Sequence, residues 1–202
     1  MSKKIGLFGG TFDPVHNGHV AIAESAYKEL GLDEIWFLPE LNPKFKQKVT
    51  PYRHRLNMLK LATYEYGYMV VDRLEMQKQG TDHGLDSLKL LNSMFPGNKY
   101  IMIMGADAFA HFPKWQNAKE FTKYTEFYIF PRNNQNIDKT DIKPTKCVYF
   151  ISRSVPNNFM NNVSSSKIRS NLRSEDISRF MPTKVLEYIL NNNLYLKSKA
   201  KS

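Results

Sequence analysis

Six short hydrophobic runs alternate along the chain with stretches that carry the spacing of amphipathic helices. The runs are almost continuously apolar, as strands buried on both faces of a sheet are. They are Lys4–Phe8, Glu34–Leu38, Met69–Leu74, Tyr100–Met104, Glu126–Phe130 and Val148–Ile151. Strand–helix–strand alternation predicts parallel strands joined by right-handed crossovers. The predicted fold class is therefore α/β, with a doubly wound parallel sheet.

The helical stretches have recognisable starts and ends. The first has Gly31 where a C-terminal cap is expected, the second begins at Pro51, and the third stops at Pro96-Gly97. Their apolar faces comprise Val20, Ala23, Ala26, Tyr27 and Leu30, then Leu56, Leu59 and Ala62, then Leu85, Leu88, Leu91 and Phe95. Two short helices, Ser164–Leu172 and Thr183–Asn192, are expected to close the chain as an appendage packed on the sheet. We expect one domain over residues 1–196 and a disordered tail over 197–202.

Composition excludes several classes of protein. The 202 residues are 42% hydrophobic and 13% aromatic, which argues against long disorder and leaves ample material for a core. No run approaches the ~18 apolar residues that span a bilayer, and the first apolar stretch is too short for a signal peptide. The single cysteine, Cys147, excludes an intramolecular disulfide and agrees with a reducing compartment. A cytoplasmic protein without a membrane partner is expected.

The chain is basic, with 29 Lys and Arg against 19 acidic residues and a formal charge of +10. Such a surplus attracts nucleic acid, anionic lipid or phosphorylated small molecules, or simply forms a solvated surface. Lys44, Lys46, Lys48, Arg53 and Arg55 cluster just after a predicted strand end. Because α/β proteins place ligands at that end of the strands, this cluster is the most informative part of the charge.

Residues 9–19 read Gly-Gly-Thr-Phe-Asp-Pro-Val-His-Asn-Gly-His and lie between a predicted strand and a predicted helix. A glycine-rich turn in that context is typical of phosphate binding. Gly9 and Gly10 let the backbone approach a nucleotide without an intervening Cβ. A tight turn that binds nothing is the plainer alternative.

The same turn carries two histidines, His16 and His19, three residues apart. If Asn17 and Gly18 begin the helix, both rings lean toward an anion at the helix N-terminus. An imidazole there can donate a hydrogen bond to a phosphoryl oxygen whose charge grows in a transition state. A zinc site is the alternative, although no third ligand is evident.

A second phosphate-binding pattern lies far downstream, at residues 164–169, which read Ser-Ser-Ser-Lys-Ile-Arg. A serine run that opens a helix supplies capping hydroxyls and free backbone N–H groups, with Arg169 one turn further on. This arrangement suits the β- and γ-phosphates of a triphosphate. A plain capped helix with a solvated arginine is the alternative.

Together the two patterns resemble the signature motifs of the nucleotidyltransferase superfamily, which moves a nucleoside monophosphate from a triphosphate to an acceptor. The resemblance implies a Rossmann-like nucleotidyltransferase fold. It implies ATP binding by Gly9, Gly10, Thr11, Phe12, His16, Gly18, His19, Ser164, Ser165, Ser166, Ile168 and Arg169. Ser166 stands where the superfamily usually has Thr, a change that keeps the hydroxyl.

Within the superfamily, nearly the whole chain resembles the bacterial nicotinate mononucleotide adenylyltransferases. The resemblance is carried by Gly105-Ala106-Asp107, Phe112-Pro113-Lys114-Trp115, Leu41-Asn42-Pro43-Lys44-Phe45-Lys46, His54-Arg55-Leu56 and the end from Tyr188 to Tyr195. It implies that Trp115 stacks on the pyridine ring and that Asp107 holds the mononucleotide. Lys46 matches a basic residue expected to contact phosphate.

The chain also departs from this family. Phe45 takes the place of a usual His, and His83 and Gly84 stand where the family has Tyr-Thr at the nicotinate end. Backbone N–H groups around Gly84 can still hold a carboxylate, aided by a protonated His83. Arg132 matches a recurring Arg, but Asn133-Asn134 follows it instead of Pro-Gly. The preference between nicotinate and nicotinamide mononucleotide therefore stays open.

The implied reaction joins ATP to nicotinate mononucleotide and releases pyrophosphate, by in-line attack without a covalent intermediate. His16 and His19 are expected at the α-phosphate, and Lys46 and Arg169 at the triphosphate. Mg²⁺ would accompany ATP, held mostly by phosphates and waters rather than by protein ligands.

Two other functions stay open. Pantetheine phosphate is the alternative acceptor, and an RNA-binding protein without catalysis is the alternative of another class. The sequence has no basic repeat interleaved with aromatic residues, so no nucleic-acid partner is expected. A homo-oligomer stays open, as does the choice between a lid and a surface insertion for residues 132–146.

Overall fold

A computed structural model of the chain describes residues 2–43, 46, 48–71, 83–115, 117–130, 149–151, 163–172 and 175–196. Its strands are β1 Lys4–Gly10, β2 Glu34–Pro39, β3 Met69–Val71, β4 Lys99–Gly105, β5 Glu126–Phe130 and β6 Tyr149–Ile151. Each predicted hydrophobic run thus overlaps one strand. The predicted ends of two of these strands, at Leu74 and Val148, lie outside the described residues.

The strands form one six-stranded sheet in the order β3-β2-β1-β4-β5-β6, and every neighbouring pair is parallel. The chain builds outward from β1 to β3, then returns to the centre and builds outward from β4 to β6. This is the doubly wound order, and it confirms the predicted fold class. The order reverses between β1 and β4, and the crevice outside the carboxyl ends of these strands is where such folds bind ligands.

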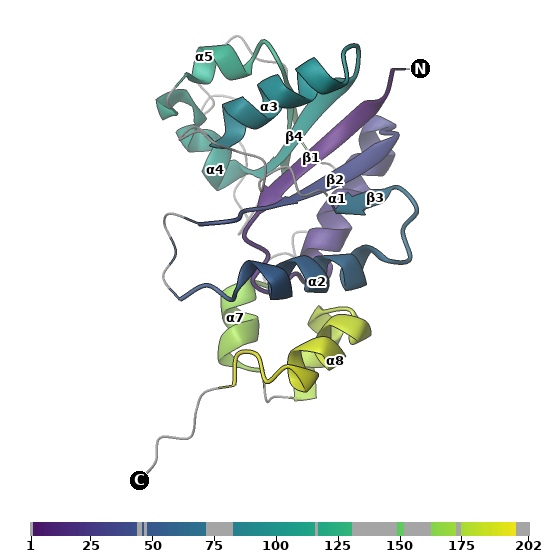
Figure 1. Cartoon of the computed structure of the whole chain (residues 1–202), viewed down its shortest axis with the longest axis vertical. Coiled ribbons are helices and arrows are strands. Elements are labelled where there is room, and N and C mark those ends of the chain that lie inside the picture. Colours follow the sequence, from purple (N-terminus) through teal and green to yellow (C-terminus); the bar gives the residue numbers. More distant parts are fainter. Residues whose placement is uncertain are drawn as a thin grey trace.

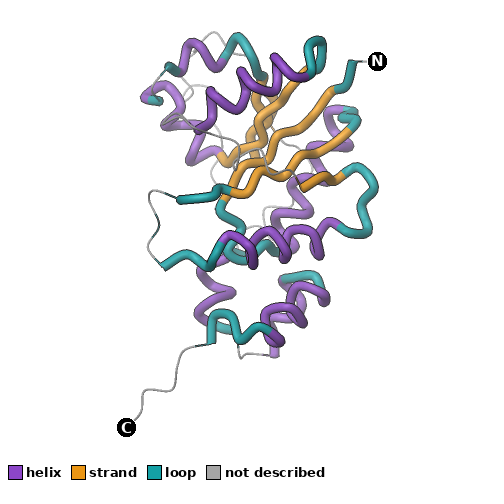
Figure 2. Tube along the Cα trace, viewed as in Figure 1, coloured by secondary structure: helices purple, strands orange, loops and turns teal. Residues whose placement is uncertain are grey.

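Helices cover both faces of the sheet (Figures 1 and 2). They are α1 Asn17–Leu30, α2 Tyr52–Thr63, α3 His83–Met94, α4 Ala106–His111, α5 Ala118–Phe121, α7 Ser165–Ser170 and α8 Thr183–Asn191, with 3₁₀ turns at Phe112–Lys114 and Glu175–Phe180. The helices α1 and α2 lie on one face, and α3, α4 and α5 lie on the other (Figure 1).

Burial of the strands on both faces explains their continuous hydrophobicity. In β5, Phe127 and Ile129 pack with the helices of the α3 face. Tyr128 and Phe130 pack with those of the α1 face. Because alternate residues of a strand point to opposite faces, a strand covered on both sides has no position that favours a charged residue.

The helix boundaries follow the predicted signals closely. Gly31 ends α1 in the left-handed conformation, with φ 58°, and its N–H donates to the Tyr27 carbonyl. Pro51 is the N-cap of α2, whose inner face buries Leu56 and Leu59. The helix α3 ends at Met94, so Phe95 lies beyond it and is 41% exposed.

The C-terminal helices extend the core on the α1 face. Val163, Ile168, Val185 and Ile189 belong to the same hydrophobic cluster as β1 and α1. The helix α8 packs against α2, beyond the sheet (Figure 1). Among the described residues, no helix is both long and apolar enough to cross a membrane. The expected tail from residue 197 lies outside the described residues.

Candidate active site

The turn between β1 and α1 lies at the carboxyl edge of the sheet, beside β4. The strand β1 ends at Gly10 and α1 begins at Asn17, so the helix starts where the sequence predicted. His16 is the N-cap residue, with an extended backbone of φ −147° and ψ 168°. Both histidines therefore lie at the N-terminus of a 14-residue helix, where its dipole favours an anion.

The two imidazoles lie against each other, with their planes tilted by 31°. Their ring centroids are 3.7 Å apart, and the Phe12 ring contacts His19 edge-on at 5.0 Å. The backbone N–H of His16 donates to Nδ1 of His19 at 3.2 Å. Because Nδ1 accepts this hydrogen bond, the proton of a neutral His19 ring is on Nε2, which is then a donor. The turn therefore fixes both the position and the tautomer of His19.

The second predicted motif lies directly on the first, although about 150 residues separate them in sequence. Arg169 of α7 donates from Nη1 to the Asp13 carbonyl at 2.6 Å, and Ser165 donates from its hydroxyl to the Pro14 carbonyl at 2.9 Å. A second guanidinium nitrogen of Arg169 donates to the Ser166 hydroxyl at 3.3 Å. The structure thus brings the two predicted phosphate-binding motifs into one site.

The serine run caps its helix as predicted. The Ser164 hydroxyl accepts a hydrogen bond from the Lys167 backbone N–H at 3.2 Å. Ser166 is exposed beside it. Ile168, by contrast, is only 1% exposed and Phe12 only 2%, so their side chains belong to the core. Any contact of these two residues with a nucleotide would have to come from their backbone.

The glycines and the threonine of the turn differ in their surroundings. A Cβ at Gly10 would lie 3.1 Å from the Phe12 ring, whereas a Cβ at Gly9 would meet no protein atom within 4 Å. Packing therefore constrains Gly10, whereas a Cβ at Gly9 would have room, so contacts within the described part of the chain do not explain that glycine. Thr11 is buried and donates from its hydroxyl to Glu40 at 2.6 Å, which ties the turn to the end of β2.

A buried arginine joins the turn to the basic segment that follows β2. Arg55 is 1% exposed and donates to the carbonyls of Thr11 at 2.8 Å, Leu41 at 3.1 Å and Thr50 at 2.9 Å. Burial lowers the pKa of Arg55, and the carboxylates of Asp13 and Glu40 oppose this shift. Lys46, which lies in this segment, is exposed.

Two of the predicted mononucleotide-binding residues follow β4. Asp107 is exposed in the first turn of α4, and a Cβ at Gly105 would lie 2.5 Å from its Oδ1. The Asp107 carboxylate therefore folds back over the Gly105 backbone, although its exposed side chain could turn aside for a Cβ there. Trp115 is half-buried, and its ring packs edge-on against Phe112 and Phe121, each at 5.5 Å.

The third predicted mononucleotide segment starts α3 on the same side of the sheet. Gly84 is its second residue, and a Cβ there would lie 2.9 Å from the Phe121 ring. His83 begins the helix, but its side chain lies outside the described residues, as do Arg132 and the segment 132–146. Phe121 thus contacts both Trp115 and the start of α3.

A family model described as cytidylyltransferase-like matches residues 7–171. The nicotinate-nucleotide adenylyltransferase of Bacillus subtilis (strain 168) is 35% identical over 196 residues, which cover 96% of this chain and 98% of the relative. The chain belongs to the nicotinate-nucleotide adenylyltransferase family. A probable nicotinate-nucleotide adenylyltransferase of Clostridium perfringens (strain 13 / Type A) is 34% identical over 200 residues, covering 96% of this chain and 98% of its own.

Solved structures agree with this family in fold. The Plasmodium falciparum nicotinic acid mononucleotide adenylyltransferase complexed with NaAD has a TM-score of 0.82 at 24% identity, over 96% of this chain and 97% of that one. The same protein complexed with APC has a TM-score of 0.80 at the same identity and coverage. At 24% identity, the similarity shows that this chain and the Plasmodium falciparum protein share a fold.

Sequence reasoning assigned no role to Asp13 and Tyr195 and placed Arg55 in the basic cluster at the ligand-binding edge, yet all three hold the turn and Arg55 is buried. Arg55 had a usable signal, because residues 55, 59 and 62 have the spacing of one helix face and the last two are apolar. An arginine at such a position has to find buried acceptors. Tyr195 had no comparable signal, since nothing in its local sequence indicates a partner 182 residues away.

Proposed function

We propose that this enzyme transfers AMP from ATP to nicotinate mononucleotide, giving nicotinate adenine dinucleotide and pyrophosphate. The observation that carries the proposal is the close imidazole pair at the N-terminus of α1, on a turn to which Arg169 and Ser165 donate hydrogen bonds. A fixed donor beside a helix N-terminus is suited to a phosphorus centre whose oxygens gain charge.

The chemistry needs no covalent enzyme intermediate. An oxygen of the acceptor's 5′-phosphate attacks the α-phosphorus of ATP in line, and a new phosphoanhydride bond forms. The bond from the α-phosphorus to the bridging oxygen breaks, and pyrophosphate leaves with that electron pair. We assign His16 and His19 to the α-phosphate and its bridging oxygen, where the Nε2–H of His19 donates to growing charge.

The triphosphate is assigned to Lys46, Arg169 and the serines 164–166. Arg169 suits this role because its guanidinium carries five donors, of which two are engaged, with Asp13 and Ser166, among the described residues. Among the described residues, no group of three or more His, Cys, Asp or Glu side chains could hold a metal ion. We propose that ATP enters as its Mg²⁺ complex, in which phosphates and waters would hold the ion and its positive charge would stabilise the leaving pyrophosphate.

The mononucleotide is assigned to the other side of the crevice. The half-buried Trp115 offers an indole face on which an electron-poor pyridinium ring can stack. We assign Asp107 to the mononucleotide, and the backbone around Gly84, with His83 and Arg132, to its carboxylate and phosphate groups. The lone Cys147 and the +10 charge support a cytoplasmic enzyme whose basic surface serves phosphorylated substrates rather than nucleic acid.

The test is pyrophosphate release by the purified full chain with ATP and MgCl₂, offered nicotinate mononucleotide, nicotinamide mononucleotide or pantetheine phosphate. We expect the nicotinate form to give the highest kcat/KM and a product with the mass of nicotinate adenine dinucleotide. Faster turnover of the amide form would change the assigned substrate. Turnover with pantetheine phosphate but with neither mononucleotide would show that the acceptor is pantetheine phosphate. RNA retention without any release would overturn the assignment as an enzyme.

A further inference from the structure

The segment after α8 contacts the turn between β1 and α1, which carries His16. Tyr195 follows α8 and donates from its hydroxyl to Oδ1 of Asp13 at 2.6 Å. Asp13 lies three residues before His16 in the sequence. Tyr195 lies 182 residues after Asp13. In Figure 1 the yellow segment after α8 lies at the same end of the molecule as α7, whose Arg169 also binds the turn.

Asp13 is where these contacts meet. Its side chain is buried, at 5% exposure. Oδ2 accepts the backbone N–H of Thr50 at 3.3 Å, and the main-chain carbonyl accepts Arg169 at 2.6 Å. A buried carboxylate depends strongly on its donors, because without them its desolvation is not compensated. Of these two hydrogen bonds to the carboxylate, the one from the Tyr195 hydroxyl is the shorter. It also comes from the segment farther away in the sequence.

The direction of this hydrogen bond is fixed by chemistry. Burial, together with the hydrogen bond to Asp13, raises the pKa of Tyr195 above its ordinary range. The tyrosine therefore stays protonated at neutral pH and donates, while an ionised carboxylate can only accept. A charge-assisted bond of this kind is about twice as strong as one between neutral groups, so its loss should be felt by the turn.

We propose that Tyr195 is a positioning residue for catalysis, which holds the Asp13–His16 segment through the Asp13 carboxylate and so orients the two imidazoles. This inference rests on the proposed function, in which His16 and His19 meet the α-phosphate. Tyr195 bonds to Asp13, and the proposed function gives it no contact with either substrate.

A positioning role predicts a specific kinetic pattern. The groups assigned to substrate binding, such as Lys46 and Trp115, keep their places when only one hydroxyl is removed. A small displacement of the imidazoles, however, lowers the rate of the chemical step steeply. We expect Tyr195→Phe to lower kcat about tenfold while KM for each substrate changes less than about twofold.

The chain provides a matched control in Tyr188, on α8. Its hydroxyl accepts from Nδ2 of Asn57 at 3.0 Å and lies 2.9 Å from Nδ1 of His54. Tyr188→Phe thus removes the same atom from the same C-terminal region, at a contact between α8 and α2. We expect it to lower the melting temperature no more than Tyr195→Phe does, because its partners Asn57 and His54 are not carboxylates, and to leave kcat within about twofold of the unmodified enzyme.

The two variants decide the inference. Unchanged kcat in Tyr195→Phe, or an equal fall in both variants, would overturn it, because either result assigns Tyr195 a purely structural role. Hydrogen exchange supplies a readout independent of activity. Backbone amides of residues 9–20 should exchange faster in Tyr195→Phe than in Tyr188→Phe, and equal exchange would also contradict the inference. If the unmodified chain releases no pyrophosphate, the proposed function is refuted instead. The hydrogen-exchange comparison would still test whether Tyr195 holds the turn.

Discussion

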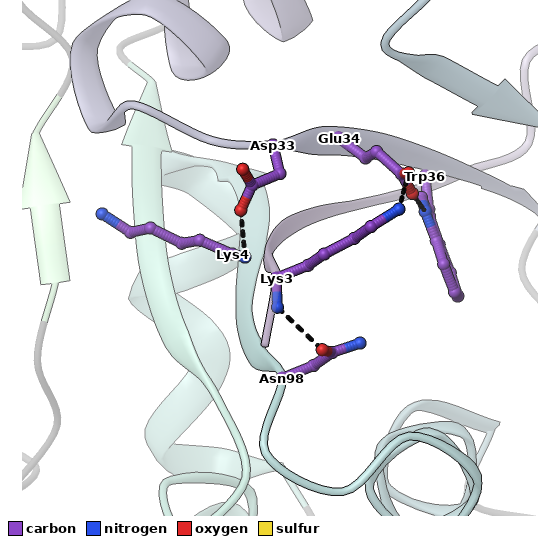
Figure 3. A network of polar contacts seen from close by, with 6 residues as sticks. All are labelled: Lys3, Lys4, Asp33, Glu34, Trp36 and Asn98. Atoms are coloured by element: carbon purple, nitrogen blue, oxygen red, sulfur yellow. Dashed lines mark hydrogen bonds and ion pairs between the residues drawn. The ribbon is translucent and has the colours of Figure 1, made fainter. Parts of the chain in front are cut away.

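At the amino edge of the sheet, one Lys–Glu pair and short hydrogen bonds to Asp33 and Asn98 close the strand ends, whereas at the carboxyl edge two arginines donate to the main chain of a turn. Figure 3 shows the amino edge, where Lys3 pairs with Glu34, and Glu34 also accepts from the Trp36 indole at 2.7 Å. The backbone N–H of Lys4 donates to Asp33 at 2.7 Å, and that of Lys3 donates to Asn98 at 2.8 Å.

The carboxyl edge, formed by the other ends of the same strands, is built differently. Arg55 binds the carbonyls of Thr11, Leu41 and Thr50, and Arg169 binds that of Asp13. These guanidinium groups shape the backbone of the turn, and the imidazoles stand on that backbone. The amino edge thus closes the ends of β1, β2 and β4 with local pairs, while the carboxyl edge holds a turn around a helix N-terminus.

The difference predicts how the two edges respond to substitution. Exposed ion pairs contribute little to stability, because water and salt screen them. Buried donors to main-chain carbonyls contribute much more, because their removal leaves acceptors without partners. Substitutions at the amino edge should therefore change stability slightly and activity not at all, and substitutions at the carboxyl edge should change both.

The largest effect is expected from Arg55→Met, which removes the buried cation from the carboxyl edge. The carbonyls of Thr11, Leu41 and Thr50 lose their donor, and Asp13 and Glu40 lose a neighbouring positive charge. We expect the free energy of unfolding to fall by about 3–5 kcal/mol, measured by urea denaturation.

The control for this variant is Arg53→Met on the same helix. Arg53 is exposed, so its replacement should change the free energy of unfolding by about 0.5 kcal/mol or less. Equal losses in the two variants would mean that burial of Arg55 does not stabilise the turn, and the contrast between the edges would lose its main support.

His19→Ala is expected to have the next largest effect, and it acts on turnover. Losing a fixed donor to a developing phosphoryl charge should lower kcat by about 10²–10³-fold. The far-ultraviolet circular dichroism should stay unchanged, since α1 keeps its other contacts. Asn98→Ala, at the amino edge, serves as the comparison and should leave kcat within about twofold. A His19→Ala enzyme with near-normal kcat would remove this imidazole from the mechanism.

A third and smaller effect is expected from Gly84→Ala. The added Cβ would lie 2.9 Å from the Phe121 ring, which packs against Trp115, so both rings have to move. We expect KM for nicotinate mononucleotide to rise about fivefold while KM for ATP stays constant, in steady-state kinetics. This result would support the proposed division of the carboxyl edge into an ATP side and a mononucleotide side.

Two further variants test this explanation of Gly84. Gly67→Ala should be silent, because a Cβ there meets no protein atom within 4 Å. Adding Phe121→Leu to Gly84→Ala should restore part of the mononucleotide affinity, since the smaller side chain makes room. A rise in KM for both substrates alike would show that the collision disturbs the whole site.

The contrast between Gly84 and the strands indicates what can be predicted from sequence. The six strands and the cap at Gly31 were predictable because local patterns determine them, namely continuous hydrophobicity and a glycine after a helix. The glycine turn and the serine cap, which we assign to phosphate, were recognisable as local structures for the same reason. The packing of Gly84 against Phe121, by contrast, depends on shapes 37 residues apart, and no local pattern reports it.

The same limit applies to the hydrogen bonds that hold the turn between β1 and α1. Arg169 was assigned to phosphate by its motif, but its hydrogen bond to the Asp13 carbonyl depends on how α7 docks on the turn. The bond between Tyr195 and Asp13 likewise forms only when α8 packs on α2 and returns the chain to the turn. Sequence identifies residues that face a ligand more readily than residues that hold those residues in place.

The smallest effect is expected at the amino edge, from Glu34→Gln. The hydrogen bond from Lys3, followed by that from Trp36, lowers the pKa of Glu34 below its ordinary value of 4.5. A lowered carboxylate pKa contributes stability above the ordinary pKa and loses it as pH falls through the lowered one. We expect Glu34→Gln to lower the melting temperature by about 2 °C or less at pH 7, with kcat unchanged.

The pH and salt dependence of this variant completes the comparison of the two edges. The melting temperatures of the unmodified enzyme and Glu34→Gln should differ by a constant amount above about pH 5 and converge in more acidic solution. In about 1 M NaCl the difference should shrink further, because screening weakens an exposed pair. Glu24→Gln, which breaks the exposed pair with Lys28 on α1, should show an even smaller shift. A severalfold loss of kcat in Glu34→Gln would contradict the separation between the edges, because it would couple the Lys3–Glu34 pair to a turn at the opposite ends of the strands.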